Sequence, residues 1–222
     1  MKKLLMFAAV FSLAAFAATA QANLLDDGSF ELSTSGSQIS NSDWSVTTSD
    51  PNNLTEGGIF TDGGWAIKDG ARGFWYQSFQ GDPNGAAVDL DLAQGVLAPT
   101  SGDYRLTFWS AREPNVAATS ILASLSSDGT GGTASLELLT ATYNDGLNFL
   151  DGGGTRFSLF LLGVTAGDTL TVSTAMVGGV NSTVNPQSLM VDSYDLIFIP
   201  EPTSIALAGL GLLGAFSMRR KR

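Results

Sequence analysis

The sequence contains neither cysteine nor histidine among its 222 residues. Without cysteine the chain cannot form a disulfide, a thiolate zinc site or a cysteine nucleophile, so its fold must depend on a hydrophobic core. Without histidine it lacks imidazole zinc ligands, the Ser-His-Asp triad and the commonest general base. These two absences exclude many enzyme classes, and we expect a protein without catalytic activity.

Positive charge is also scarce. The full chain has 11 basic and 21 acidic residues, and six of the basic ones lie at the two ends. Residues 23–199 keep five basic and twenty acidic residues, a net charge near −15. Such a surface should repel nucleic acid and anionic lipid, and it would stay soluble in an anionic polysaccharide matrix.

The first 22 residues have the pattern of a secretory signal peptide. Lys2 and Lys3 precede an apolar run over residues 4–18, and two small-x-small sites follow it, ATA and AQA. Signal peptidase needs small side chains beside its cut. We predict cleavage after Ala22, so that Asn23 opens the mature chain. The alternative is a retained anchor, although the apolar run is short for a spanning helix of about 20 residues.

Residues 200–222 contain three segments in a fixed order. These are Pro200-Glu201-Pro202, an uncharged run over 203–218, and Arg219-Arg220-Lys221-Arg222. The prolines exclude a regular helix before residue 203, so we predict a transmembrane helix over 203–218. By the positive-inside rule the basic cluster stays cytoplasmic, which places residues 23–199 outside the inner membrane.

This order resembles the PEP-CTERM sorting signal of exopolysaccharide-producing Gram-negative bacteria. The resemblance implies processing by an exosortase, a membrane protease that acts near the Pro-Glu-Pro motif, in addition to signal peptidase. The protein would be anchored transiently in the inner membrane and then reach the cell surface or the extracellular matrix. The alternative is a plain C-terminal anchor that is never processed.

Residues 23–199 are predicted to form one all-β domain. Asp-Gly and Gly-Gly turn signals separate short β-rich runs, and no stretch shows a sustained helical period. We predict strands over 86–92, 104–110, 120–126, 155–164, 169–177 and 189–199, with Tyr104, Leu106 and Phe108 on one face. Several short strands between turn signals indicate a single jelly-roll sandwich.

Several segments of this domain resemble galactose-binding-like jelly rolls, including carbohydrate-binding modules. They are residues 23–31 (NLLDDGSFE), Trp44, 102–109 (GDYRLTFW), 167–170 (GDTL) and 191–196 (VDSYDL). Asp27 and Ser193 depart from the asparagine and the second aspartate usual in that family. The resemblance implies the fold and a structural Ca²⁺ that ties the first strand to the last.

The positions that match this calcium site are Gly28, Glu31 and Asp192. Oxygen ligands from two distant segments suit a hard cation. The alternative is that Glu31 and Asp192 are solvated or capping groups at strand ends, and the sequence has no compact EF-hand pattern to favour the metal.

A saccharide site needs exposed aromatic faces together with polar groups that hold hydroxyls. The glycine-rich segment over 62–76 supplies both, in Trp65, Trp75 and Tyr76 beside Asp62, Lys68, Asp69 and Arg72. The alternative for these aromatic residues is core packing, to which we also assign Trp44 and Trp109.

Two carboxylates leave open a third function. Asp89 and Asp91 lie two residues apart and would share one face of a strand. Glycoside hydrolases use a pair of carboxylates for acid–base catalysis. Acidic residues that alternate with apolar ones are, however, the ordinary solvent face of a half-buried strand. We therefore expect a non-enzymatic surface or matrix protein that binds exopolysaccharide. The alternatives are a structural biofilm protein without a sugar ligand and a glycan-active hydrolase.

Overall fold

The computed structural model describes residues 21–49, 58–76, 88–139, 146–179 and 188–200. Residues 1–20 of the predicted signal peptide and the predicted transmembrane helix lie outside these ranges. Within them, no helix is long and apolar enough to cross a membrane.

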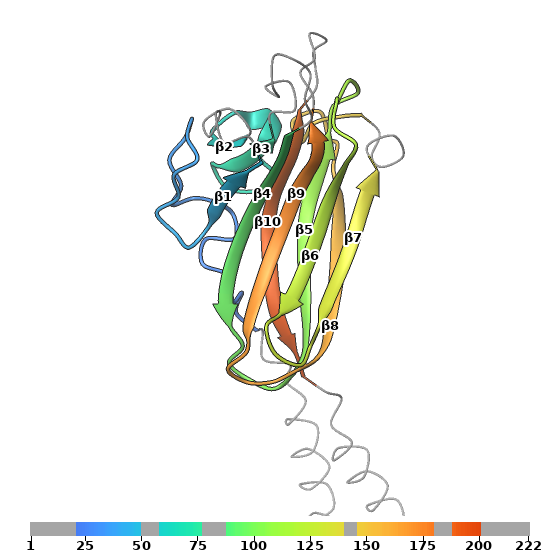
Figure 1. Ribbon diagram of the computed structural model, residues 1–222. Coiled ribbons are helices and arrows are strands. Elements are labelled where there is room, and N and C mark those ends of the chain that lie inside the picture. The colour runs from blue at the N-terminus through green and yellow to red at the C-terminus, as the bar shows by residue number, and fades with distance from the viewer. Residues whose placement is uncertain (1–20, 50–57, 77–87, 140–145, 180–187, 201–222) are drawn as a thin grey trace, which may run out of the picture.

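The described residues form a sandwich of two five-stranded antiparallel sheets (Figure 1). Sheet A contains, in spatial order, β2 (Gly58–Thr61), β3 (Gly73–Tyr76), β10 (Leu189–Ile199), β5 (Gly102–Arg112) and β8 (Thr155–Val164). Sheet B contains β1 (Ser45–Thr48), β4 (Val88–Leu97), β9 (Thr169–Gly179), β6 (Ser120–Ser127) and β7 (Thr133–Leu139). A single 3-10 turn, η1 (Gly64–Ala66), precedes β3. The prediction of an all-β sandwich is confirmed.

All six predicted strands are present, and β8 and β10 have the predicted bounds. The sequence reasoning missed β1, β2, β3 and β7. The first three have only four residues each, too few to show a period. β7 lies at the edge of sheet B; its residues Ala134, Leu136 and Leu138 do alternate with polar ones, and this signal was overlooked.

The core lies between the sheets and follows the period-two alternation of the strands. Tyr104, Leu106 and Phe108 of β5 are fully buried, as predicted from their shared face. Burying one such side chain stabilises the fold by about 1.5–3 kcal/mol. Trp44 is also buried, with its ring 5.0 Å from that of Tyr194, so its assignment to the core is confirmed.

A β-bulge in β10 connects this strand to the N-terminal segment. Pairing with β5 shifts between Asp192 and Asp195, and Ser193 has a φ of 55°, which is uncommon for a residue other than glycine. The amide of Tyr194 donates a hydrogen bond to the carbonyl oxygen of Gly28 at 2.8 Å. A Cβ atom at Gly28 would lie 2.1 Å from the carbonyl oxygen of Tyr194, so this close approach requires glycine.

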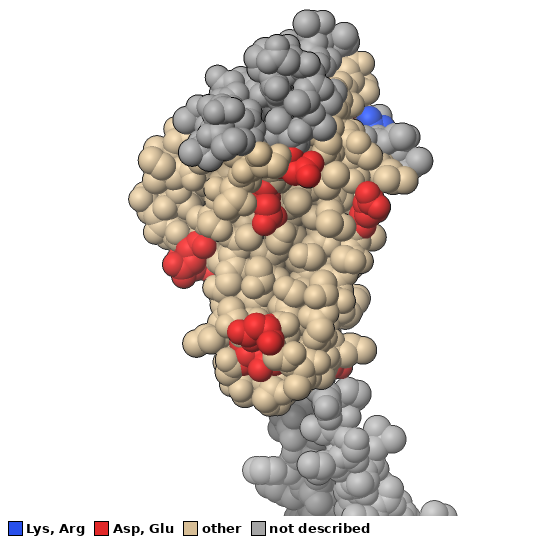
Figure 2. All heavy atoms as spheres, viewed as in Figure 1, with Lys and Arg blue, Asp and Glu red and all other residues tan. Residues whose placement is uncertain are grey.

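Charge is distributed unequally between the two sheets. The strands of sheet B contain no lysine or arginine, and they carry Asp89, Asp91 and Glu137. On the side of the molecule where sheet B lies in front, acidic side chains are scattered over the surface and basic ones appear only at one margin (Figure 2). The five basic residues of the domain all lie within sheet A or in the segment that leads into β3.

Candidate functional site

A cavity of about 530 Å³ opens on the outer side of sheet A, away from the core. Its walls come from the N-terminal segment, the loop between η1 and β3, and strands β5, β8 and β10. A volume of this size lies within the range of roughly 300–1,000 Å³ typical of small-molecule sites. We call it the Trp109 pocket; its lining residues are Asn23, Gly28, Ser29, Lys68, Asp69, Trp109, Arg156, Ser193, Tyr194 and Asp195.

Trp109 is half-buried at the edge of this pocket. It packs against a second hydrophobic cluster on the outer side of sheet A, which also contains Trp65, Trp75, Phe149 and Met190. The rings of Trp65 and Trp75 meet edge to face at 4.7 Å. The assignment of Trp109 to the main core was therefore wrong. Because Phe108 points between the sheets, the next residue of the strand must point outward.

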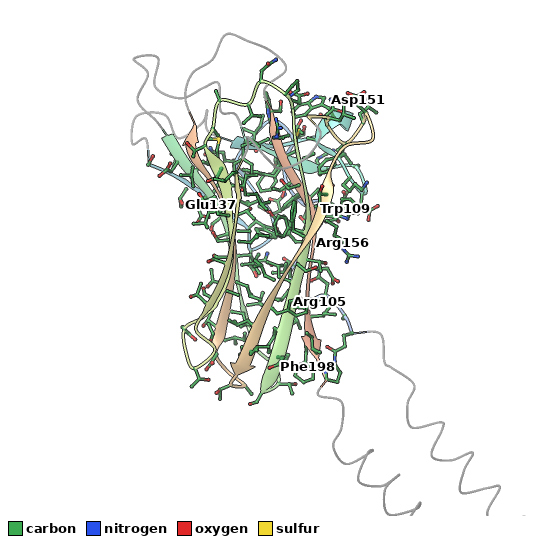
Figure 3. All side chains as sticks on the ribbon, turned by 90° about the vertical axis from the view of Figure 1, so that its right-hand side faces the viewer. Arg105, Trp109, Glu137, Asp151, Arg156 and Phe198 are labelled. Carbon is green, nitrogen blue, oxygen red and sulfur yellow. The ribbon has the colours of Figure 1, made fainter. Side chains whose placement is uncertain are left out.

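Two basic side chains flank Trp109. The ammonium nitrogen of Lys68 lies 4.0 Å from the centre of the Trp109 ring, a cation–π contact. Arg156 of β8 pairs in register with Trp109, and its Nη2 donates a hydrogen bond to the hydroxyl of Thr107 at 2.9 Å. Figure 3 shows Trp109, Arg156 and Arg105 following one another along β5 and β8. The hydrogen bond to Thr107 holds the guanidinium group beside the aromatic ring.

Acidic and hydroxyl groups also line the pocket. Asp69 follows Lys68 in the loop before β3, whereas Ser193 and Asp195 come from the bulged part of β10. The hydroxyl oxygen of Ser193 is buried and has no hydrogen-bond partner among the described residues. The pocket therefore combines an aromatic side chain with two cationic donors and two carboxylate acceptors.

The residues predicted to bind a saccharide occupy four different places. Asp69 lines the pocket, and Trp65 and Trp75 lie in the adjoining hydrophobic cluster. Tyr76 points into the core, where it is fully buried and its hydroxyl donates to the carbonyl oxygen of Thr174 at 2.6 Å. Tyr76 therefore cannot contact a ligand on the outer side of sheet A. A sugar-contacting role for Trp65 and Trp75 stays a prediction.

Arg72 lies at the end of the same loop, outside the lining of the pocket. Its backbone amide and that of Ala71 donate hydrogen bonds to Oε1 of Glu31 at 3.1 and 2.7 Å. Asp192 holds the other end of the loop, because its Oδ2 accepts from the amides of Lys68 and Asp69 at 2.6 and 3.0 Å. Two carboxylates thus fix the loop that carries Lys68.

These same contacts bear on the predicted calcium site. Oδ1 of Asp192 accepts from the amide of Ser193 at 2.6 Å, so both of its oxygens already receive N–H donors. Glu31 likewise receives two amides, and the carbonyl oxygen of Gly28 accepts from Tyr194. Among the described residues, no group of three or more acidic side chains is placed to hold a metal. N–H donors thus occupy both oxygens of Asp192 and Oε1 of Glu31, whereas Oε2 of Glu31 accepts no hydrogen bond within the described part of the chain. The calcium site stays a prediction.

Burial has a strong effect on Asp192. Removal of this carboxyl from solvent raises its pKa to about 7, although the amide donors of Asp69, Lys68 and Ser193 favour the charged form. The group that fixes the loop therefore changes its protonation near neutral pH.

Asp89 and Asp91 lie elsewhere, on the outer side of sheet B. An oxygen of Asp89 accepts from the amide of Gly178 at 2.7 Å, and Asp91 accepts from the hydroxyl of Ser173. Burial raises the pKa of Asp91, and the Ser173 hydroxyl opposes this shift. Neither residue lines the Trp109 pocket.

Comparison with known proteins gives one sequence match and several structural ones. Residues 198–221 match the PEP-CTERM protein-sorting motif. No curated protein matches the chain.

The folded domain is similar to solved structures that share little sequence with it. The carbohydrate-binding module TmCBM61, solved with β-1,4-galactotriose, is 18% identical with a TM-score of 0.51 over 80% of this chain and 99% of the module. A cleaved adhesin domain of Lys-gingipain from Porphyromonas gingivalis is 20% identical with a TM-score of 0.51, over 78% of this chain and 96% of that domain.

The enzymatically active domain of a bacteriophage tailspike protein is 11% identical with a TM-score of 0.52. That match covers 80% of this chain and 21% of the tailspike chain. At these identities the likeness defines the fold alone. The chain therefore consists of an antiparallel β-sandwich with the fold of carbohydrate-binding modules, followed in sequence by a PEP-CTERM protein-sorting motif at residues 198–221.

Proposed function

We propose that this protein is exported, is sorted through its C-terminal motif, and binds a saccharide in the Trp109 pocket without cleaving it. The proposal rests on the side chains that line this pocket. One half-buried tryptophan adjoins donors from Lys68 and Arg156 and acceptors from Asp69 and Asp195. The C–H faces of sugars pack on aromatic rings, and their hydroxyl groups need both donors and acceptors.

The sorting part of the proposal rests on residues 198–221. Signal peptidase and an exosortase would process the two ends, and the inner membrane would anchor the chain before the second cut. The domain would then reside at the cell surface or in the extracellular matrix of a Gram-negative bacterium, with exopolysaccharide as its partner. The match to the sorting motif and the predicted signal peptide support this route.

A structural surface protein without a sugar ligand is the second candidate, and a hydrolase is the third. The position of Asp89 and Asp91 outside the pocket argues against the pair that the sequence suggested for hydrolysis. Asp69 and Asp195 are the carboxylates that any hydrolysis in the pocket would use.

Binding to a panel of immobilised glycans tests the proposal. We expect a subset of glycans to bind the purified domain and Trp109→Ala to abolish this binding. Leu97→Ala is the control, because Leu97 is an apolar residue of β4 in sheet B that is 68% exposed and lies outside the pocket lining. No binding by the wild-type domain would favour the structural role. Release of reducing ends from a bound glycan, lost in Asp69→Asn or Asp195→Asn, would make the protein a hydrolase.

A further inference from the structure

Two of the five basic residues of the domain line the Trp109 pocket. These are Lys68 and Arg156, and Arg105 follows on the same outer face of β5. Sheet B has acidic residues and no basic ones in its strands. A domain with a net charge near −15 thus has three of its five cations in or next to one cavity.

Within the described part of the chain, these cations have no ion-pair partner. Among the described residues, Lys68, Arg105 and Arg156 form no ion pair, although acidic residues outnumber basic ones fourfold. Nη2 of Arg156 donates a hydrogen bond to the hydroxyl of Thr107, and the other nitrogen atoms of its side chain have no hydrogen-bond partner in the described part of the chain. The Nε atom of Arg105 is buried and likewise has no partner there.

The pocket lining holds two cationic and two carboxylate side chains. Asp69 follows Lys68 in the loop before β3, and Asp195 of β10 lies in register with Thr107, the hydrogen-bond partner of Arg156. A ligand in the cavity would meet both kinds of group. Sugar hydroxyls can donate to the carboxylates, but the two cationic side chains are matched best by negative groups.

We infer that the saccharide bound in the Trp109 pocket is acidic, with carboxylate groups that pair with Arg156 and Lys68. The inference rests on the proposed saccharide binding and narrows its ligand class. The guanidinium of Arg156 offers a planar pair of donors suited to a carboxylate, and the flexible ammonium of Lys68 supplies a second charge. Asp69 and Asp195 accept hydrogen bonds from hydroxyl groups of the same ligand.

Arg105 adds a third positive charge outside the pocket lining. It lies four residues before Trp109 on β5, a spacing of about 13 Å along a strand. A polymer that enters the pocket can therefore place a later acidic unit at Arg105. Longer oligosaccharides should bind more tightly than short ones for this reason, and Arg105→Gln should remove the gain with length.

The test uses calorimetric titration of the purified domain with pairs of oligosaccharides that differ only in charge. The pairs are oligogalacturonate with its methyl ester, and oligomannuronate with its carboxyl-reduced form. We expect the acidic member to bind roughly tenfold more tightly, since charge-assisted hydrogen bonds are the stronger ones. Added salt should weaken binding of the acidic member only.

Variants assign the effect to individual residues. Arg156→Gln and Lys68→Met should each bring the affinity ratio of the acidic to the neutral member towards one. Arg112→Gln is the control, because it removes the same charge at the end of β5, outside the pocket lining. An equal loss of the ratio in Arg112→Gln would overturn the assignment of the acid preference to the pocket.

The outcomes separate the inference from the proposed function. If neutral members bind at least as tightly as acidic ones and Trp109→Ala abolishes both, the acid preference is wrong and saccharide binding stands. If no oligosaccharide of either kind binds, the proposed function fails and the inference fails with it.

Discussion

The side-chain oxygen of Asn23 accepts a hydrogen bond from the backbone amide of Leu196 at 2.8 Å, although 173 positions separate the two residues. The side-chain nitrogen of Asn23 donates to the carbonyl oxygen of Tyr194, also at 2.8 Å. The residue that we predict to open the mature chain thus holds the strand that leads into the sorting motif. The first residue of the predicted mature chain and the last strand before the sorting motif therefore lie side by side.

Replacement of Asn23 should show how much these hydrogen bonds contribute to the stability of the domain. Asn23→Ala removes both hydrogen bonds and leaves backbone groups of β10 without partners, so we expect the free energy of unfolding to fall by about 1–3 kcal/mol. Urea unfolding followed by tryptophan fluorescence gives this quantity. Asn41→Ala is the control, since Asn41 makes one exposed hydrogen bond to the carbonyl oxygen of Leu32 and should matter less. Equal losses in the two variants would contradict the prediction.

Gly28 should tolerate no side chain. In Gly28→Ala the new methyl group would meet the carbonyl oxygen of Tyr194, so the N-terminal segment must move away from the bulge of β10. We expect a loss of at least about 2 kcal/mol in stability, comparable with overpacking of a core. Gly95→Ala is the matched control, because its methyl group would make only an ordinary contact, 3.6 Å from Thr169. A stable Gly28→Ala domain with unchanged midpoint would show that this close approach is absent.

The pKa of Asp192 should make stability depend on pH. Burial raises this pKa from 3.8 to about 7, so the folded state keeps a proton that the unfolded state releases between these values. The free energy of unfolding should then fall as pH rises from about 4 to 7, by at most about 1.4 kcal/mol per pH unit, and this contribution should level off above pH 7.

Thermal unfolding at several pH values compares the wild-type domain with Asp192→Asn. The variant should be less stable at low pH, because its amide group must face the N–H donors of the loop, and its pH dependence should be flatter. Asp43→Asn, which changes an exposed carboxylate, is the control. Parallel curves for Asp192→Asn and the wild-type domain would rule out Asp192 as the titrating group.

The sequence predicted the long strands because their alternation is a local property. Leu189–Ile199 and Thr155–Val164 each contain enough residues to show which face is buried. The four-residue strands β1–β3 do not, since their pairing depends on β4 and β10, far away in the chain. Local periodicity thus defines the long strands, and tertiary contacts define the four-residue strands.

The pocket was only partly predictable for the same reason. Lys68 and Asp69 lie in a glycine-rich segment that suggested a binding loop, but Trp109 and Arg156 meet only through sheet pairing. One signal for Trp109 was present in the sequence: it alternates with Phe108, whose inward face was predicted. Nothing in the spacing of Arg156 indicates that it lies beside Trp109.

The position of the sorting motif in the fold limits where the chain can be cut. β10 pairs with β5 as far as Ile199, which lies opposite Asp103, and the ring of Phe198 lies 5.6 Å from that of Tyr104. A cut before Ile199 would remove part of a paired strand and its packing, whereas a cut after it leaves the sandwich intact. We therefore expect processing at or after Pro200, close to Pro200-Glu201-Pro202.

Intact-mass spectrometry of the protein from its native host, with cell fractions kept separate, measures this directly. A C-terminus near Pro200–Pro202 in the surface or matrix fraction is the expected result, and Glu201→Ala should leave chains that end at Arg222 in the membrane fraction. Glu137→Ala removes an exposed carboxylate of β7 and should be processed normally. Wild-type chains that still end at Arg222 would show that residues 200–222 act as a plain anchor. A C-terminus before Ile199 would show that the protease opens β10, against the pairing seen here.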